Sequence, residues 1–287
     1  MDDVITGTAS APGSCGELVQ GSIAGQPFLI SCPINIHSQI TVQLSADLPR
    51  SGQFKKIDQA LQLFLKENFP EFGWLVSRKS MLPPGKGMAS STADIAASLA
   101  ATAKALGVDI TPEQIAQLAL QVEPSDGVMF NELCYFDYLK GTTYRYLGDP
   151  PRAEVILLDP GGTVDTVAFN NNSSLKKLNI AKETQVKEAL DLVKGGIEMQ
   201  DIEMIGRGST ISALANQRIL PKPELPEVIK WGQSFNAAGV VIAHSGTVMG
   251  LIIPTETGRT QDAIAFIQSK KPHWEITLTK LINGGVR

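Results

Sequence analysis

The segment 83–94, PPGKGMASSTAD, combines residue types that can bind an anion. Its glycines let a backbone come close to a ligand, and the alanine-rich run that follows predicts a helix. The first N–H groups of a helix have no partner within the helix and carry partial positive charge, so they can hold a phosphate group. Lys86 adds a full charge, and the hydroxyls of Ser90 and Ser91 could coordinate magnesium, because hard cations take oxygen ligands. A plain connector with an N-cap serine is the alternative interpretation.

The common nucleotide-binding patterns do not fit this segment. The Walker pattern needs Ser or Thr after Gly-Lys, but Gly87 follows Lys86. The dinucleotide pattern GxGxxG fails at Ser90. The remaining pattern is a proline, three residues, a glycine, an aliphatic residue, a small residue and two serines, and by itself it leaves both interpretations open.

Two carboxylates lie close together in the stretch LALQVEPSDGVMF. Glu123 ends a predicted helix, and Asp126 follows on a turn opened by Pro124. Carboxylates suit both a bound metal ion and the proton of a reacting hydroxyl. Solvated turn residues are the alternative, because Asp, Ser and Pro dominate turns.

The cysteines and histidines give little support to other chemistries. PGSCG around Cys15 is a near miss to the GxSxG nucleophile motif, but no histidine lies at a suggestive position. Cys32 and Cys134 are expected to be small buried apolar groups. The spacing of the three cysteines and three histidines argues against a disulfide framework and against a transition-metal site.

Composition favours a soluble globular protein. The 287 residues are 43% hydrophobic and 19% charged, with a formal net charge of −4, which argues against disorder, a nucleic-acid surface and an electrostatic membrane anchor. No apolar run approaches the roughly 18 residues that span a bilayer, and the acidic start MDDVITG lacks the pattern of a signal peptide. We therefore expect a cytoplasmic location.

The elements that must position these residues alternate irregularly between helix and strand. Residues 4–44 read as short β segments broken by glycine and proline. Helices are predicted over 57–69, 92–106, 112–123, 183–198, 201–216 and 225–236, strands over 74–82, 153–159 and 274–280, and a hairpin over 239–254. The pattern predicts an α+β protein whose sheets are covered by helices on one side, with a boundary near 150–180.

Three segments together resemble the motifs of the GHMP family, the kinases of galactose, homoserine, mevalonate and phosphomevalonate. They are ASAPGSCGELVQG at 9–21, PPGKGMASSTA at 83–93 and AAGVVIAHSGTVMGLII at 237–253, and their order and spacing agree along nearly the whole chain. The resemblance implies the GHMP kinase fold. Residues 1–165 would form an N-terminal domain with the nucleotide loop, resembling ribosomal protein S5 domain 2, and residues 166–287 a C-terminal ferredoxin-like α/β domain.

The resemblance also implies an ATP-dependent, magnesium-dependent phosphorylation of an alcohol. The residues implied to bind the nucleotide are Pro84, Gly85, Lys86, Gly87, Met88, Ala89, Ser90, Ser91, Thr92, Ser245 and Gly246. Magnesium is assigned to Ser91 and Glu123, and Asp126 is assigned to the attacking hydroxyl as a proton acceptor or a positioning group. His244 and Ser245 either line the turn of the third motif or belong to a structural hairpin.

One departure from the family pattern concerns charge. Many members carry a lysine or arginine directly after Ala-Pro-Gly, where this chain has Ser14. Any such cation must come from elsewhere, and Lys86 is one candidate for a catalytic role. The residues expected near the substrate are Ser14, Cys15, Glu17 and Asp126. Glu17 could meet the ammonium group of an amino acid, with a surface or capping glutamate as the alternative.

The particular residues within and near the motifs narrow the range of expected substrates. SCGELVQG, EPSD and AHSGTVMGL resemble the bacterial members that phosphorylate L-threonine for the cobalamin side chain. The resemblance implies a small-molecule partner, L-threonine, with no nucleic acid and no membrane, and it leaves a homodimer open. The alternatives are another alcohol kinase, of the homoserine or mevalonate type, and a catalytically silent nucleotide-binding homologue.

Overall fold

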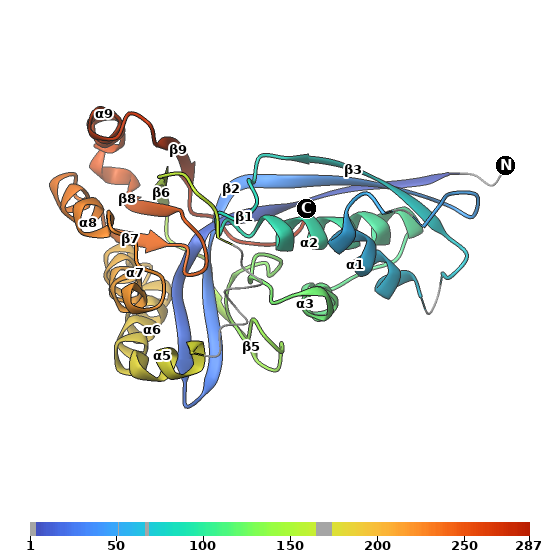
Figure 1. Cartoon of the computed structure of the whole chain (residues 1–287), viewed down its shortest axis with the longest axis horizontal. Coiled ribbons are helices and arrows are strands. Elements are labelled where there is room, and N and C mark those ends of the chain that lie inside the picture. The colour runs from blue at the N-terminus through green and yellow to red at the C-terminus, as the bar shows by residue number, and fades with distance from the viewer. Residues whose placement is uncertain (1–3, 51, 67–68, 165–173) are drawn as a thin grey trace.

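The computed structural model describes residues 4–50, 52–66, 69–164 and 174–287 (Figure 1). The first part of the chain is a long hairpin of β1 (Ile5–Ile23) and β2 (Gln26–Ser45). The two strands pair antiparallel along nearly their whole length and are joined by Ala24 and Gly25, both with positive φ, as two-residue hairpin turns require.

The prediction of short broken β segments over 4–44 is therefore wrong. Glycine and proline do not end these strands, because register shifts between Pro12 and Gly13 and around Glu17 absorb the irregular residues. The shift at Glu17 also matters for the sheet, since Glu17 pairs with Ile242 of a distant strand.

The described residues form a nine-stranded sheet in the order β5-β4-β2-β1-β7-β8-β6-β9, with β3 also paired to β2. The remaining strands are β3 (Gly73–Ser80), β4 (Leu133–Phe136), β5 (Tyr144–Gly148), β6 (Ala153–Asp159), β7 (Gly239–Ile242), β8 (Met249–Pro254) and β9 (Glu275–Lys280). The predicted strands and the β7–β8 hairpin are confirmed, whereas β4 and β5 were not predicted. They are short and carry little alternation of polar and apolar residues.

Three helices cover one face of the β1–β3 part of the sheet (Figure 1). They are α1 (Lys55–Leu65), α2 (Ser90–Leu106) and α3 (Pro112–Val122). The alanines of α2 allow close approach to β1: a Cβ on Gly7 would lie 1.9 Å from the carbonyl oxygen of Ala101. Thr111 caps α3 in a full capping box with Gln114.

A second group of helices packs on β1 and on the strands β6 to β8, with α5 and α6 against β1, α7 against β1 and β7, and α8 and α9 against β6 to β8 (Figure 1). It contains α5 (Leu175–Ala181), α6 (Glu183–Glu198), α7 (Ile202–Ala215), α8 (Leu225–Ser234) and α9 (Thr260–Lys270), with short 3-10 turns at Asn216–Arg218 and Thr255–Thr257. The three predicted helices are confirmed, and α5 and α9 are additional. Trp231, Phe235 and Trp274 belong to a core between α8, α9 and one face of these strands.

The fold is α+β, as the sequence predicts. β6 comes before the predicted boundary in the sequence, but it pairs with β8 and β9, which come after it. The predicted boundary between 165 and 166 lies outside the described residues, and the division into two domains stays a prediction. Among the helices that are described, none combines the length and the apolar character needed to cross a bilayer.

Candidate active site

The segment 83–89 forms a loop directly before α2, and this helix begins without a side-chain cap. Its N-cap residue is Ala89, in a left-handed conformation at φ 54°, rather than a serine. The N-cap serine expected for a plain connector is therefore not present at this helix start. The helix start keeps uncapped N–H groups, which suit an anion.

Gly87 brings this loop against the turn between β7 and β8. Its φ is +79°, and a Cβ there would lie 2.3 Å from the Cβ of Ala243 and 2.9 Å from the Cα of Gly246. The carbonyl oxygen of Lys86 accepts hydrogen bonds from the N–H groups of Thr247 and Val248, at 2.9 and 3.2 Å. The predicted motifs at 83–93 and 237–253 therefore contact each other directly and form one structural unit.

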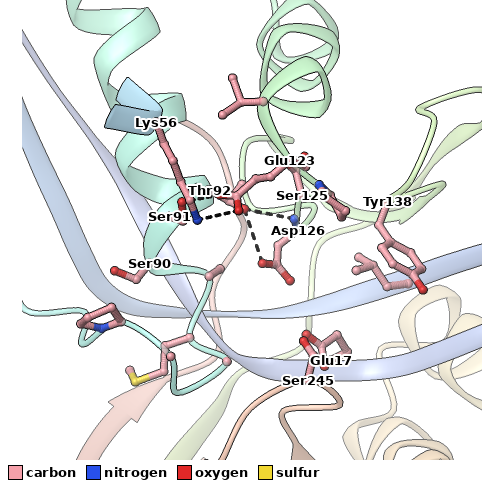
Figure 2. A pocket seen from close by; sticks show the side chains of 18 of the residues that line it. Glu17, Lys56, Ser90, Ser91, Thr92, Glu123, Ser125, Asp126, Tyr138 and Ser245 are labelled. Carbon is pink, nitrogen blue, oxygen red and sulfur yellow. Dashed lines mark hydrogen bonds and ion pairs between the residues drawn. The ribbon is translucent and has the colours of Figure 1, made fainter. Parts of the chain in front are cut away.

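A cavity of about 280 Å³ lies beside this unit. Its walls come from β1, the 83–89 loop, the start of α2, and the end of α3 with the residues that follow it. Single residues are contributed by β2, α1, the segment after β4 and the β7–β8 turn. Figure 2 shows polar side chains from these elements pointing toward one another. Glu17, Ser91, Glu123, Asp126 and Ser245 all line the cavity.

Glu123 lies between a hydroxyl and an ammonium group. The hydroxyl of Ser91 donates to its Oε1, and the Nζ of Lys56 lies 2.6 Å from its Oε2 (Figure 2). Glu123 is the C-cap residue of α3, where the backbone becomes extended, so the helix end fixes its position. The alternative of a fully solvated turn residue is excluded for Glu123, since its side chain is 11% exposed.

Asp126 is held at the cavity by contacts with the first turn of α2. Its backbone N–H donates to the hydroxyl of Thr92 at 3.2 Å, and that hydroxyl lies 3.5 Å from its Oδ2. Removal from bulk solvent raises the pKa of Asp126 well above its ordinary value, and the nearby carboxyl of Glu17 raises it further.

Glu17 is buried and hydrogen-bonded to the β7–β8 turn. Its Oε2 accepts from the backbone N–H of His244 at 2.8 Å and lies 3.0 Å from the Nδ1 of the same residue. Burial lowers the pKa of His244, and two lysines nearby lower it further, so the ring is neutral. Nδ1–H therefore donates to Glu17, and Nε2 accepts from the hydroxyl of Ser212 at 3.0 Å.

Two buried lysines balance the charge of Glu17. The Nζ of Lys182 donates to Asn216 Oδ1 at 3.0 Å, and the Nζ of Lys222 donates to the carbonyl oxygen of Gly246 at 2.5 Å. Burial lowers the pKa of each to about 8, and the charge of Glu17 opposes that shift. Burial also raises the pKa of Glu17 itself, to about 7.

The structure brings most of the predicted site residues to the cavity. Those lining it are Pro84, Gly85, Gly87, Met88, Ala89, Ser90, Ser91, Thr92, Glu17, Glu123, Asp126 and Ser245. Lys86 does not line it: its side chain is 14% exposed, and its Nζ lies 2.7 Å from Asp159 Oδ2. Gly246 contacts the loop through its backbone, as described above.

Ser14 and Cys15 lie behind the cavity wall. Both are fully buried, and among the described residues the Ser14 hydroxyl has no hydrogen-bond partner. Cys15 packs against β8, since a Cβ on Gly250 would lie 2.6 Å from its Sγ. Burial raises the pKa of the Cys15 thiol, so it is not activated as a nucleophile. Cys32 and Cys134 are buried free thiols, as predicted.

Sequence reasoning missed Lys56, Lys182 and Lys222. Lys182 and Lys222 carry no motif, and only the packing of distant segments brings them to Glu17. For Lys56 a weak signal exists: it belongs to a pair of lysines at the start of a predicted helix, where positive charge opposes the helix dipole.

An uncapped helix start beside a glycine loop, facing carboxylates and hydroxyls across one cavity, is an arrangement that can bind phosphate groups. Comparison with known proteins gives the family. Residues 55–131 match the GHMP kinases N terminal domain. The chain is 32% identical to the L-threonine kinase of Salmonella typhimurium, over 97% of this chain and 94% of that one. The chain belongs to the GHMP kinase family.

Solved structures support the fold. The homoserine kinase of Cytophaga hutchinsonii superposes with a TM-score of 0.72 at 17% identity, covering 98% of this chain and 96% of its own. A protein named MDDEF, solved with MVAPP, AMPPCP and magnesium, superposes with a TM-score of 0.72 at 13% identity, covering 99% of each chain. At these identities the likeness concerns the fold alone.

Proposed function

We propose that this protein transfers the terminal phosphate of ATP to the side-chain hydroxyl of L-threonine, giving O-phospho-L-threonine for the synthesis of the cobalamin side chain. The observation that carries the proposal is the presence of Glu17 and Asp126 in the same cavity as the phosphate loop. An amino acid with a hydroxyl group needs a carboxylate for its ammonium group and a second group beside its hydroxyl. The relative named L-threonine kinase supports this choice of substrate.

The nucleotide phosphates would be bound by the 83–89 loop and the uncapped start of α2, with Ser245 and Gly246 opposite. The oxygens of Ser91 and Glu123 fit a magnesium ion, because they meet at the cavity and a magnesium shell is completed by phosphate oxygens and water. When bound there, magnesium would neutralise charge on the phosphates. These side chains hold the phosphate-bearing end of the nucleotide at the helix start.

The acceptor would lie against β1. Glu17, oriented by two donors of His244, would accept hydrogen bonds from the ammonium group of threonine. In the transfer, a bond forms between the threonine hydroxyl oxygen and the terminal phosphorus, and the bond from that phosphorus to the bridging oxygen of ADP breaks. Asp126 either takes the hydroxyl proton or orients the hydroxyl. The raised pKa of Asp126 makes its ionised form a stronger base and at the same time favours the protonated form, which would donate to the hydroxyl instead.

The other roles expected from the sequence stay predictions. They are contacts of Ser14 and Cys15 with the substrate, a catalytic role for Lys86, a homodimer, and a cytoplasmic location with neither nucleic acid nor membrane as partner. In this structure Lys86 balances the charge of Asp159.

The direct test is mass-spectrometric analysis after incubation with ATP, magnesium and an equimolar mixture of L-threonine, L-serine, L-homoserine and mevalonate. We expect phosphothreonine as the main product. Phosphorylation of homoserine or mevalonate without phosphothreonine would identify another GHMP alcohol kinase. Binding of ATP without any product would identify a catalytically silent homologue.

A further inference from the structure

Phosphate transfer from ATP places negative charge on the phosphate oxygens, and a cation close to them stabilises the transition state. This inference rests on the proposed function. Two positions considered from the sequence do not supply that cation to the cavity. Ser14 is neutral and buried. The ammonium group of Lys86 is paired with Asp159 outside the cavity lining.

Lys56 is the one lysine or arginine among the described residues that line the cavity. Its Nζ lies 2.6 Å from Glu123 Oε2, and Ser91 donates to the other oxygen of the same carboxylate. Figure 2 shows the Lys56 side chain reaching from α1 toward Ser91 and Glu123, above the start of α2. Its charge therefore lies at the phosphate-binding side of the cavity.

The other cations near the site do not line the cavity. Arg78 pairs with Asp94 at 2.7 Å and also donates to the hydroxyl of Ser90 at 3.4 Å, from outside the cavity lining. Lys182 and Lys222 are buried and do not line the cavity: Lys182 donates to Asn216, and Lys222 donates to the carbonyl oxygen of Gly246 in the β7–β8 turn. The side chain of Lys56, by contrast, is 43% exposed, so part of its ammonium group can meet a ligand.

The location of Lys56 in its helix argues against a purely structural role. It lies in the first turn of α1, where a positive charge is unfavourable with the helix dipole. The buried face of α1, formed by Ile57, Ala60, Leu61 and Leu65, fixes the backbone without help from Lys56. A long flexible side chain on a fixed backbone can follow a phosphate group while it remains close to Glu123.

We propose that Lys56 is a further catalytic residue of this kinase, whose ammonium group contacts the terminal phosphate of ATP during its transfer. Glu123 holds the ammonium group beside that phosphate through the ion pair. The competing interpretation is that Lys56 only neutralises Glu123 in the absence of a metal ion. The two interpretations differ in whether Lys56 distinguishes ATP from ADP.

The test compares Lys56→Met, Lys56→Arg and Lys55→Met. Lys55 is a matched control, because it has the same charge in the same helical turn and is exposed. Dissociation constants for AMPPCP, an ATP analogue, and for ADP are measured by calorimetry at fixed saturating magnesium, without threonine. Loss of a charge-assisted contact should weaken AMPPCP binding by about ten- to a hundredfold in Lys56→Met and leave ADP binding nearly unchanged. Lys56→Arg and Lys55→Met should keep the wild-type ratio.

Turnover gives the second measurement. We expect Lys56→Met to lower kcat by about a hundredfold or more, as loss of one donor to a developing oxyanion does in other enzymes. An unchanged ratio of AMPPCP to ADP affinity in Lys56→Met, with only the magnesium dependence altered, would overturn the proposal. Because the binding measurement uses no acceptor, failure of the wild type to phosphorylate threonine would count against the proposed function and not against the contact itself.

Discussion

Glu17 and Asp126 place two carboxyl groups in one cavity, and burial raises the pKa of both. The charge of Glu17 raises the pKa of Asp126 further, whereas the hydrogen bond with Asp126 lowers the pKa of Glu17. Such an arrangement is unfavourable unless a positive group is brought near it. His244 stabilises the ionised form of Glu17 through two donors, and the positive charges of Lys182 and Lys222 also favour that form. The cavity side of the pair is open to a substrate ammonium group.

The first prediction concerns pH. The pKa of Glu17 is raised to about 7, so its carboxyl is mostly neutral below that pH and mostly ionised above it. Because an ammonium group binds the ionised form, KM for threonine should rise as the pH falls from about 8 to about 6, by up to about tenfold per pH unit below the pKa. KM for ATP should change little. Glu17→Gln should raise KM for threonine and remove most of this dependence, and a pH profile unchanged in this variant would contradict the role of Glu17.

The second prediction concerns Asp126. Asp126→Asn keeps the shape of the side chain but cannot accept the hydroxyl proton, so we expect kcat to fall by about a hundred- to ten-thousandfold. ATP affinity, measured by calorimetry, should stay within about twofold, since the loop and α2 bind the phosphates. Asp109→Asn, at an exposed position, is the control. Wild-type turnover in Asp126→Asn would refute the assignment, and a modest loss without change in the pH profile would favour positioning over proton acceptance.

At the scale of elements, the site depends on the contact between the 83–89 loop and the β7–β8 turn. The loop and the turn are joined through the carbonyl oxygen of Lys86, and neither has room for a larger residue at Gly87 or Gly246. The position of the β7–β8 turn is therefore fixed relative to the start of α2.

The third prediction compares two glycines near the ends of α2. Gly87 and Gly107 both have positive φ, so alanine costs about 1 kcal/mol of backbone strain at either position. Only at Gly87 would the new Cβ also collide with Ala243 and Gly246, since a Cβ at Gly107 meets nothing within 4 Å. Gly87→Ala should therefore weaken ATP binding by at least about tenfold, whereas Gly107→Ala should lower only the melting temperature. Equal ATP affinity in both variants, measured by calorimetry, would show that the loop contact does not shape the nucleotide site.

At the scale of the whole molecule, a buried polar network joins β1, near the start of the sequence, to α7 and the β7–β8 turn, which come far later in it. Glu17 in β1 contacts His244 after β7, and His244 contacts Ser212 in α7. The sheet is continuous at the same point, because Glu17 also pairs with Ile242. The orientation of a proposed substrate-binding carboxylate is therefore set by the joining of these two parts.

The fourth prediction tests this network. His244→Ala removes a donor and an acceptor from a fully enclosed position, so the free energy of unfolding should fall by about 3 kcal/mol. A purely structural role would leave the kinetics of the folded enzyme unchanged, whereas loss of orientation at Glu17 should raise KM for threonine at least about fivefold and leave KM for ATP near its wild-type value. The exposed His273→Ala is the control in thermal melts and in kinetics. Equal increases in both KM values would argue against a specific link to Glu17.

How much could be read from the sequence depends on the range of the interactions involved. The α2 and α3 helices follow from alanine content, Gly107 and the Thr111 cap, which act within a few residues. The paired strands β1 and β2 were misread, because the glycines and prolines that suggested breaks are absorbed by bulges that only the partner strand reveals. The short strands β4 and β5 carry too little alternation to be found locally.

The sequence by itself determined the phosphate-loop segment, the two acidic residues after α3 and the resemblance to the GHMP family, because these are local patterns of residue type. Only the tertiary structure decided which charges face the cavity. In the folded chain Lys86 pairs with Asp159, Lys56 pairs with Glu123, and Glu17 contacts His244. The physical reason is that a side chain's partner across a sheet or between helices depends on packing over the whole chain, which local spacing does not encode.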